Sequence, residues 1–171
     1  IAGSTYSVYV RGICDSINSS IFSDTLNFST SCIDTITNFP YTEGFENGIS
    51  CWSQQYILGQ INWLSSEGDE YYTPHSGNRL AYIYCWDYSK KTKLISPTFD
   101  FTYLASPTLS FYHRQVGDDE DWAWLKVYYR VSQDSNWIQL MNFYNPNNQW
   151  EFDSISLPNP SATYQIAFEA D

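Results

Sequence analysis

Short runs in which apolar and polar residues alternate recur along the sequence, and they restrict the fold more than any other feature. In residues 108–115, Leu109, Phe111 and His113 would share one face of a strand, because successive side chains of a strand point to opposite sides. Residues 122–132 repeat the pattern, and turns rich in Gly, Pro and Asn separate such runs roughly every 8–12 residues. No segment has a convincing helical period. The pattern predicts an all-β protein, an antiparallel β-sandwich.

The charge of the chain argues against one large class of function. Its 171 residues include only eight Lys and Arg, which do not cluster, and the formal net charge is −11. A nucleic-acid-binding protein would need a basic patch, so no nucleic-acid partner is expected. No apolar run approaches the roughly 18 residues of a membrane-spanning helix, so no membrane span is expected either. The length suits one domain, or one domain with a fragment of another.

The cysteines indicate the cellular compartment. Cys14, Cys32, Cys51 and Cys85 form no CxxC pair, which disfavours a structural zinc site. Two disulfides are expected instead, and the nearest-neighbour pairing of the three possible ones is 14–32 with 51–85. Disulfides persist in oxidising environments, so the protein is expected to be secreted or displayed at the cell surface. The alternative is a cytosolic protein with four buried thiols.

The N-terminal residues resemble part of a known domain. YSVYVRGIC at 6–14, followed by SSIFSDTLNFSTSC at 19–32, is similar to the last two strands of a fibronectin type III domain. The resemblance implies that residues 1–32 are the C-terminal part of such a domain, whose earlier strands the sequence does not contain. Cys14 and Cys32 would then tie its last two strands. Residues 33–40 are expected to be a linker.

Residues 41–171 resemble a second family. The order of their motifs is similar to MAM-type jelly-roll domains and to the related cleaved-adhesin (choice-of-anchor J) domains of bacterial surface proteins. The main matches are F-E at 45–46, C-W-S-Q at 51–54, H-S-G-N at 75–78, L-S-F-Y at 109–112 and Y-Q-I-A-F-E-A at 164–170. The resemblance implies a jelly roll that lacks the closing L-D-D-I strand of the family. Combined with the first unit, it suggests a Bacteroidetes-type surface protein.

The same resemblance implies a Ca²⁺ (or Na⁺) site. Glu46 occupies the position of the acidic residue in the Phe-Glu motif, and Glu43, Asn47 and Asp69 would supply further oxygen ligands of the kind that Ca²⁺ prefers. The alternative is that Glu46 is an edge-strand carboxylate that faces water. The acidic run at 117–121 lacks the spacing of a calcium loop and is interpreted as a solvated hairpin tip.

Aromatic residues supply the remaining candidates. Exposed rings can stack on sugar rings, and the loop aromatics proposed for this role are Tyr71, Tyr72, Trp86 and Tyr88. Ordinary edge packing is the alternative for each. Trp124 and Trp150 lie within strand-like runs and are expected in the core. His113 is expected to be buried, and no nucleophile motif accompanies it, so no catalytic site is predicted.

The hypothesis that follows is a non-catalytic extracellular adhesion or binding module of a larger multidomain surface or secreted protein, stabilised by Ca²⁺. Its partners would be a protein or glycan at the cell surface and other domains of its own chain. A carbohydrate-binding module attached to a secreted enzyme is the main alternative. An enzyme domain such as a glycosidase is a further one, because the distances between carboxylates are not visible in a sequence.

Overall fold

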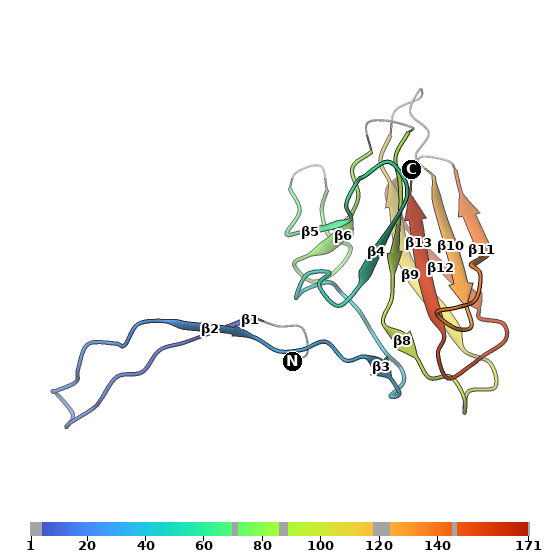
Figure 1. Cartoon of the computed structure of the whole chain (residues 1–171). Coiled ribbons are helices and arrows are strands. Elements are labelled where there is room, and N and C mark those ends of the chain that lie inside the picture. The colour runs from blue at the N-terminus through green and yellow to red at the C-terminus, as the bar shows by residue number, and fades with distance from the viewer. Residues whose placement is uncertain (1–4, 70–71, 86–88, 118–123, 145–146, 171) are drawn as a thin grey trace. The chain divides into compact units, whose positions relative to one another are not determined.

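A computed structural model describes residues 5–69, 72–85, 89–117, 124–144 and 147–170. These residues form thirteen strands and no helix, and the chain divides into two compact units, 1–33 and 34–171 (Figure 1). The prediction of an all-β antiparallel sandwich is confirmed. The described part of the chain contains no helix that could cross a membrane.

Unit 1 is a single hairpin. Its strands β1 (Thr5–Val8) and β2 (Leu26–Ser29) pair antiparallel, and the stacked rings of Tyr6 and Phe28 are 5.5 Å apart between centroids. Ile17 and Ile21, between the strands, are strongly exposed. Two strands have no second layer against which to bury apolar side chains, so the described residues of this unit, 5–33, form no core of their own.

Unit 2 is built on a five-stranded sheet in which every neighbouring pair is antiparallel. Val127, Ile166 and Leu94 point from its inner face into the core and are almost completely buried. In spatial order the strands are β11 (Ile138–Phe143), β10 (Leu125–Arg130), β13 (Gln165–Ala170), β7 (Lys91–Ile95) and β4 (Ser53–Leu58).

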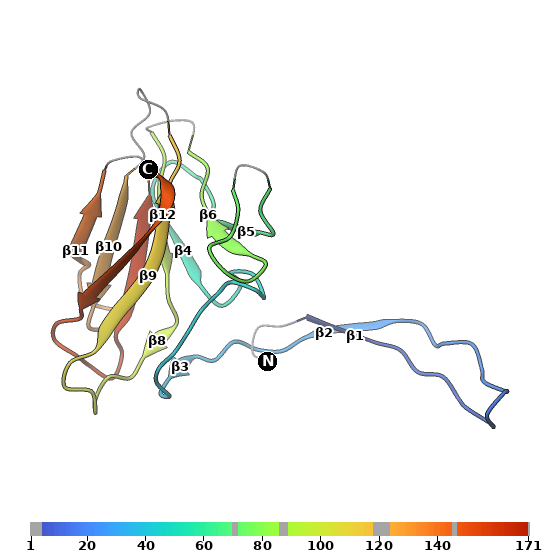
Figure 2. The ribbon, with the colours of Figure 1, turned by 180° about the vertical axis from the view of Figure 1, so that it is seen from behind.

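A two-stranded ribbon forms the second layer. It consists of β9 (Thr108–Gln115) and β12 (Asn147–Ser156), which pair antiparallel and pass in front of the larger sheet in Figure 2. Leu109 and Phe111 pack from the ribbon against the buried core cluster, as the alternating pattern predicts. His113 is also buried on this side, which confirms its predicted position.

Two short strand pairs complete unit 2. β3 (Thr35–Ile36) pairs with β8 (Thr98–Phe99) in parallel, and β5 (Leu64–Ser66) pairs antiparallel with β6 (Leu80–Tyr82). The side chain of Ile36 is buried in the core beside Phe99. Residues 33–40, expected to be a linker, contain β3 and the core residue Ile36.

The disulfide differs from both predicted bonds. It joins Cys32 to Cys51, so the pairings 14–32 and 51–85 are wrong. The geometry of the hairpin explains why Cys14 does not pair with Cys32. Cys14 lies near the hairpin tip, where its N–H donates to the carbonyl of Asn18 (2.9 Å), whereas Cys32 follows β2 at the opposite end. Cys14 is an exposed free thiol.

Candidate functional site

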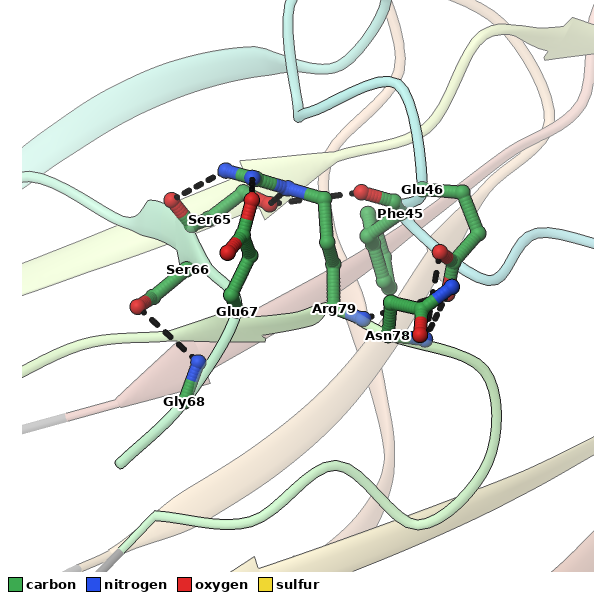
Figure 3. A network of polar contacts seen from close by, with 8 residues as sticks. All are labelled: Phe45, Glu46, Ser65, Ser66, Glu67, Gly68, Asn78 and Arg79. Carbon is green, nitrogen blue, oxygen red and sulfur yellow. Dashed lines mark hydrogen bonds and ion pairs between the residues drawn. The ribbon is translucent and has the colours of Figure 1, made fainter.

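The carboxylate of Glu46 is held by a backbone turn. Its Oε1 accepts hydrogen bonds from the N–H groups of Asn78 (2.9 Å) and Arg79 (3.2 Å), and its Oε2 accepts from Asn78 (3.2 Å) (Figure 3). Gly77 precedes these donors with a φ of +68°, and a Cβ at this position would collide with Oε1 of Glu46. Only glycine combines this backbone conformation with such a close approach. Glu46 therefore fixes the turn at 77–79.

Arg79 continues the network on the other side of the turn (Figure 3). Its Nε donates to Oγ of Ser65 (3.2 Å) and its Nη2 to the Ser65 carbonyl (3.0 Å), while Nη1 lies 3.4 Å from Oε1 of Glu67. The Ser65 hydroxyl donates in turn to the carbonyl of Phe45 (3.3 Å). The contacts tie the β5–β6 pair to the Phe-Glu segment, which is a structural role.

The other predicted calcium ligands make local contacts. Glu43 accepts hydrogen bonds from the Phe45 N–H (2.7 Å) and from the hydroxyl of Tyr41 (3.0 Å), and burial, reinforced by the Glu43 charge, raises the pKa of Tyr41. Asp69 accepts from the N–H of Tyr72 (2.8 Å). Asn47 is exposed.

These contacts do not make a calcium cage. Among the described residues, no three or more His, Cys, Asp or Glu side chains gather as a metal site would require. Ca²⁺ normally takes six to eight oxygen ligands, whereas Glu43, Glu46 and Asp69 accept hydrogen bonds from separate N–H and O–H donors. The calcium site therefore stays a prediction. The acidic residues 118–121 lie outside the described residues.

The variant Glu46→Ala, measured in buffer with Ca²⁺ and in buffer with EDTA, separates a structural role of Glu46 from a role as a calcium ligand. We expect a loss of about 1–2 kcal/mol of unfolding free energy in both buffers, because the N–H groups of residues 78 and 79 lose a charged acceptor. Urea denaturation followed by tryptophan fluorescence measures the loss, and Glu67→Ala, which removes an exposed carboxylate, is the control. A drop in wild-type stability on adding EDTA that vanishes in Glu46→Ala would establish the calcium site. Identical wild-type curves in the two buffers would refute it.

Of the four proposed ligand-binding aromatics, only Tyr72 can be placed. Tyr71, Trp86 and Tyr88 lie outside the described residues. Tyr72 is half-buried, and its ring lies 6.4 Å from that of Tyr82 and 6.3 Å from that of Tyr84. Burial raises the pKa of Tyr72, and the charge of Arg114 opposes the shift. Tyr72 therefore belongs to a packed tyrosine cluster with a positive charge close by.

A different set of rings faces outward on the β9–β12 ribbon. Tyr112 and Phe152 lie opposite each other across its two strands, with ring centroids 5.1 Å apart and with 48% and 58% of their surface exposed. His75 stacks on Tyr112 at 3.5 Å and meets the edge of Trp150 at 5.9 Å. Trp150 donates its indole N–H to the carbonyl of Thr73 (3.0 Å). We call His75, Tyr112, Trp150 and Phe152 the outer aromatic cluster.

The structure corrects the expectation for two tryptophans. Trp150 lies outside the core clusters, beside the irregularity of the ribbon between Asn147 and Glu151 that interrupts the simple alternation of faces. Trp124 precedes β10, is partly exposed, and lies 5.9 Å from the ring of Tyr144. Tyr112 could have been found from the sequence, because alternation places it opposite the core residues Leu109 and Phe111.

The buried histidine is part of the ribbon. Nε2 of His113 lies 2.9 Å from Oδ2 of Asp153, and its ring centroid is 4.1 Å from that of Phe143. Phe111 packs on the same imidazole at 5.6 Å. The pair joins β9 to β12 from the core side. The geometry indicates a structural histidine rather than a base open to a substrate.

An ion pair is buried on the face of the five-stranded sheet that points away from the core. Lys93 and Glu169 form an ion pair in which each side chain is only 6% exposed. The hydroxyl of Tyr128 donates to Oε1 of Glu169 (3.3 Å), and the Lys93 ammonium lies 4.0 Å from the centre of the Tyr128 ring. Lys126 places its ammonium 4.0 Å from the same carboxylate. Hydrogen bonds and charges thus surround Glu169.

Comparisons with known proteins show a likeness of fold. The sequence matches no protein family and no curated protein. One solved structure with a similar fold is the enzymatically active domain of tailspike protein 4 from bacteriophage CBA120, with a TM-score of 0.50 and 12% identity. The match covers 75% of this chain but only 18% of the tailspike chain. At this identity the likeness concerns the fold alone.

Proposed function

We propose that this chain is part of a non-catalytic extracellular adhesion or binding module within a larger multidomain surface or secreted protein. The outer aromatic cluster carries the proposal, because it presents exposed rings on a ribbon that is packed against a buried core. The Cys32–Cys51 disulfide supports an oxidising compartment. On the sequence motifs alone, unit 1 is assigned to the end of a fibronectin type III domain and unit 2 to the MAM-like adhesins.

The two histidines support a binding role over a catalytic one. His113 is buried against Asp153, and His75 is stacked on Tyr112, so both imidazoles are engaged in packing. A general base needs to reach the proton that it removes from a substrate. A stabilising Ca²⁺ ion near Glu46 belongs to the proposal and is decided by the EDTA experiment described above.

Adhesion can be measured with the full chain coupled to fluorescent beads. We expect the beads to be retained on wells coated with mucin, with extracellular-matrix proteins or with polysaccharide films at several times the level of albumin-coated beads. Retention should occur without cleavage of the coating, which mass spectrometry of the supernatant checks. Retention equal to that of albumin beads on all coatings, or release of coating fragments, would contradict the proposal.

A further inference from the structure

We propose that the outer aromatic cluster is a sugar-stacking site for a neutral, hexose- or pentose-based polysaccharide. The inference rests on the proposed binding function and names its ligand class and its residues. Sugar rings carry apolar C–H faces, which pack on aromatic rings, and hydroxyl groups, which need polar partners beside those rings. The ribbon offers both kinds of group on one face.

The rings are held in place before any ligand binds. Tyr112 and Phe152 project from paired positions of two strands, and the imidazole of His75 stacks on one face of the Tyr112 ring. Trp150 is anchored by the hydrogen bond from its indole N–H to the carbonyl of Thr73. Side chains that are already ordered lose little entropy on binding, which favours recognition by a few rings.

Polar groups flank the rings along the same face. Next to Tyr112 and Phe152 comes the pair Ser110 and Ser154, whose hydroxyl oxygens are 3.0 Å apart. Arg114 lies on this face of β9 two residues beyond Tyr112, and its side chain is half-buried. Rings bordered by hydroxyl and guanidinium groups suit a polyhydroxylated ligand that runs along the ribbon.

The size of the cluster and the net charge of the chain favour a neutral polysaccharide over a protein or a polyanionic glycan. Tyr112 and Phe152 are about half exposed, His75 is exposed and Trp150 is partly buried, so the four rings together offer no more than roughly 400 Å². A stable protein–protein interface needs about 800 Å² per partner, so the cluster is small for a protein. The chain carries a net charge of −11, which would repel a polyanionic glycan at long range. A neutral polysaccharide satisfies both conditions.

Affinity gel electrophoresis and calorimetry with the full chain test the assignment. The probes are four soluble polysaccharides: mixed-linkage β-glucan, arabinoxylan, galactomannan and galactan. We expect binding to at least one of them, with a loss of tenfold or more in both Tyr112→Ala and Phe152→Ala. Tyr112→Phe keeps the ring and should bind within threefold of the wild type. Tyr103→Ala removes an aromatic side chain that is 94% exposed outside the cluster, and it should bind like the wild type.

Each outcome decides for or against the site. Binding to none of the four probes overturns it, as does a loss in Tyr112→Ala and Phe152→Ala no larger than in Tyr103→Ala. Thermal melting shows which variants are folded, and if one of the two alanine variants is not, the other decides. If the beads still adhere to coated wells after these negative results, only the sugar site fails. If they do not adhere either, the proposed function fails with it.

Discussion

Replacing Glu169 with glutamine is expected to lower the free energy of unfolding by about 3–5 kcal/mol. The substitution keeps the shape of the side chain but removes its charge. The ammonium of Lys93 would stay buried without its counter-ion, and Lys126 would lose the same carboxylate. Desolvation of a charge is compensated only by its partner, so removing one partner costs more than the pair contributes. Urea denaturation with tryptophan fluorescence measures the change.

Two further variants test whether the loss of stability comes from the buried ion pair. Glu67→Gln alters an ion pair with Arg79 whose side chains are 80% and 28% exposed, and it should change stability by less than about 1 kcal/mol. The double variant Lys93→Met with Glu169→Leu removes both charges and should recover much of the loss, because apolar side chains can replace a buried pair. A loss in Glu169→Gln as small as that in Glu67→Gln would show that the pair is effectively solvated.

Reduction of the disulfide is expected to cost about 3 kcal/mol, because the bond closes a loop of roughly 20 residues in the unfolded chain. The bonded residues are Cys32 and Cys51, so the double substitution to serine should give the same loss as a reducing agent. Thermal melting with and without reductant measures the effect. The loss should be absent when the reductant is added to the double variant.

Cys14→Ser is the matched control, since Cys14 is an exposed free thiol. It should melt within about 0.5 kcal/mol of the wild type, as surface substitutions usually do. Equal sensitivity to reductant in the wild type and in the Cys32/Cys51 double variant would contradict the stabilising role of this bond.

The sequence predicted the layers of the fold better than the partners of single side chains. Alternation placed Leu109, Phe111 and His113 on the core side of one strand, and the structure agrees because the period of a strand does not depend on its neighbours. The same rule would leave Lys93 and Glu169 in water, on the opposite face from Leu94 and Phe168. Their burial and pairing depend on strands that lie far apart in the sequence.

The candidate site was harder to predict, because its contacts also join residues that lie far apart in the sequence. The carboxylate of Glu46 was expected to bind a metal, yet its described partners are N–H groups more than thirty residues later, in a turn that Gly77 permits. Trp150 and His75 meet only because β12 lies beside the 73–75 segment. The disulfide shows the limit most clearly, since choosing Cys51 for Cys32 required knowing where the hairpin tip places Cys14.

The order of strands in the large sheet has a consequence for protein synthesis. β13, which comes latest of the thirteen strands, lies in the centre, between β10 and β7. As the chain leaves the ribosome, β4 with β7 and β10 with β11 can form only separate pairs, which are marginally stable alone. The sheet can close only after residues 165–170 have emerged. The two halves of this sheet can therefore join only once β13 is available, and nascent chains are most exposed to aggregation just before that point.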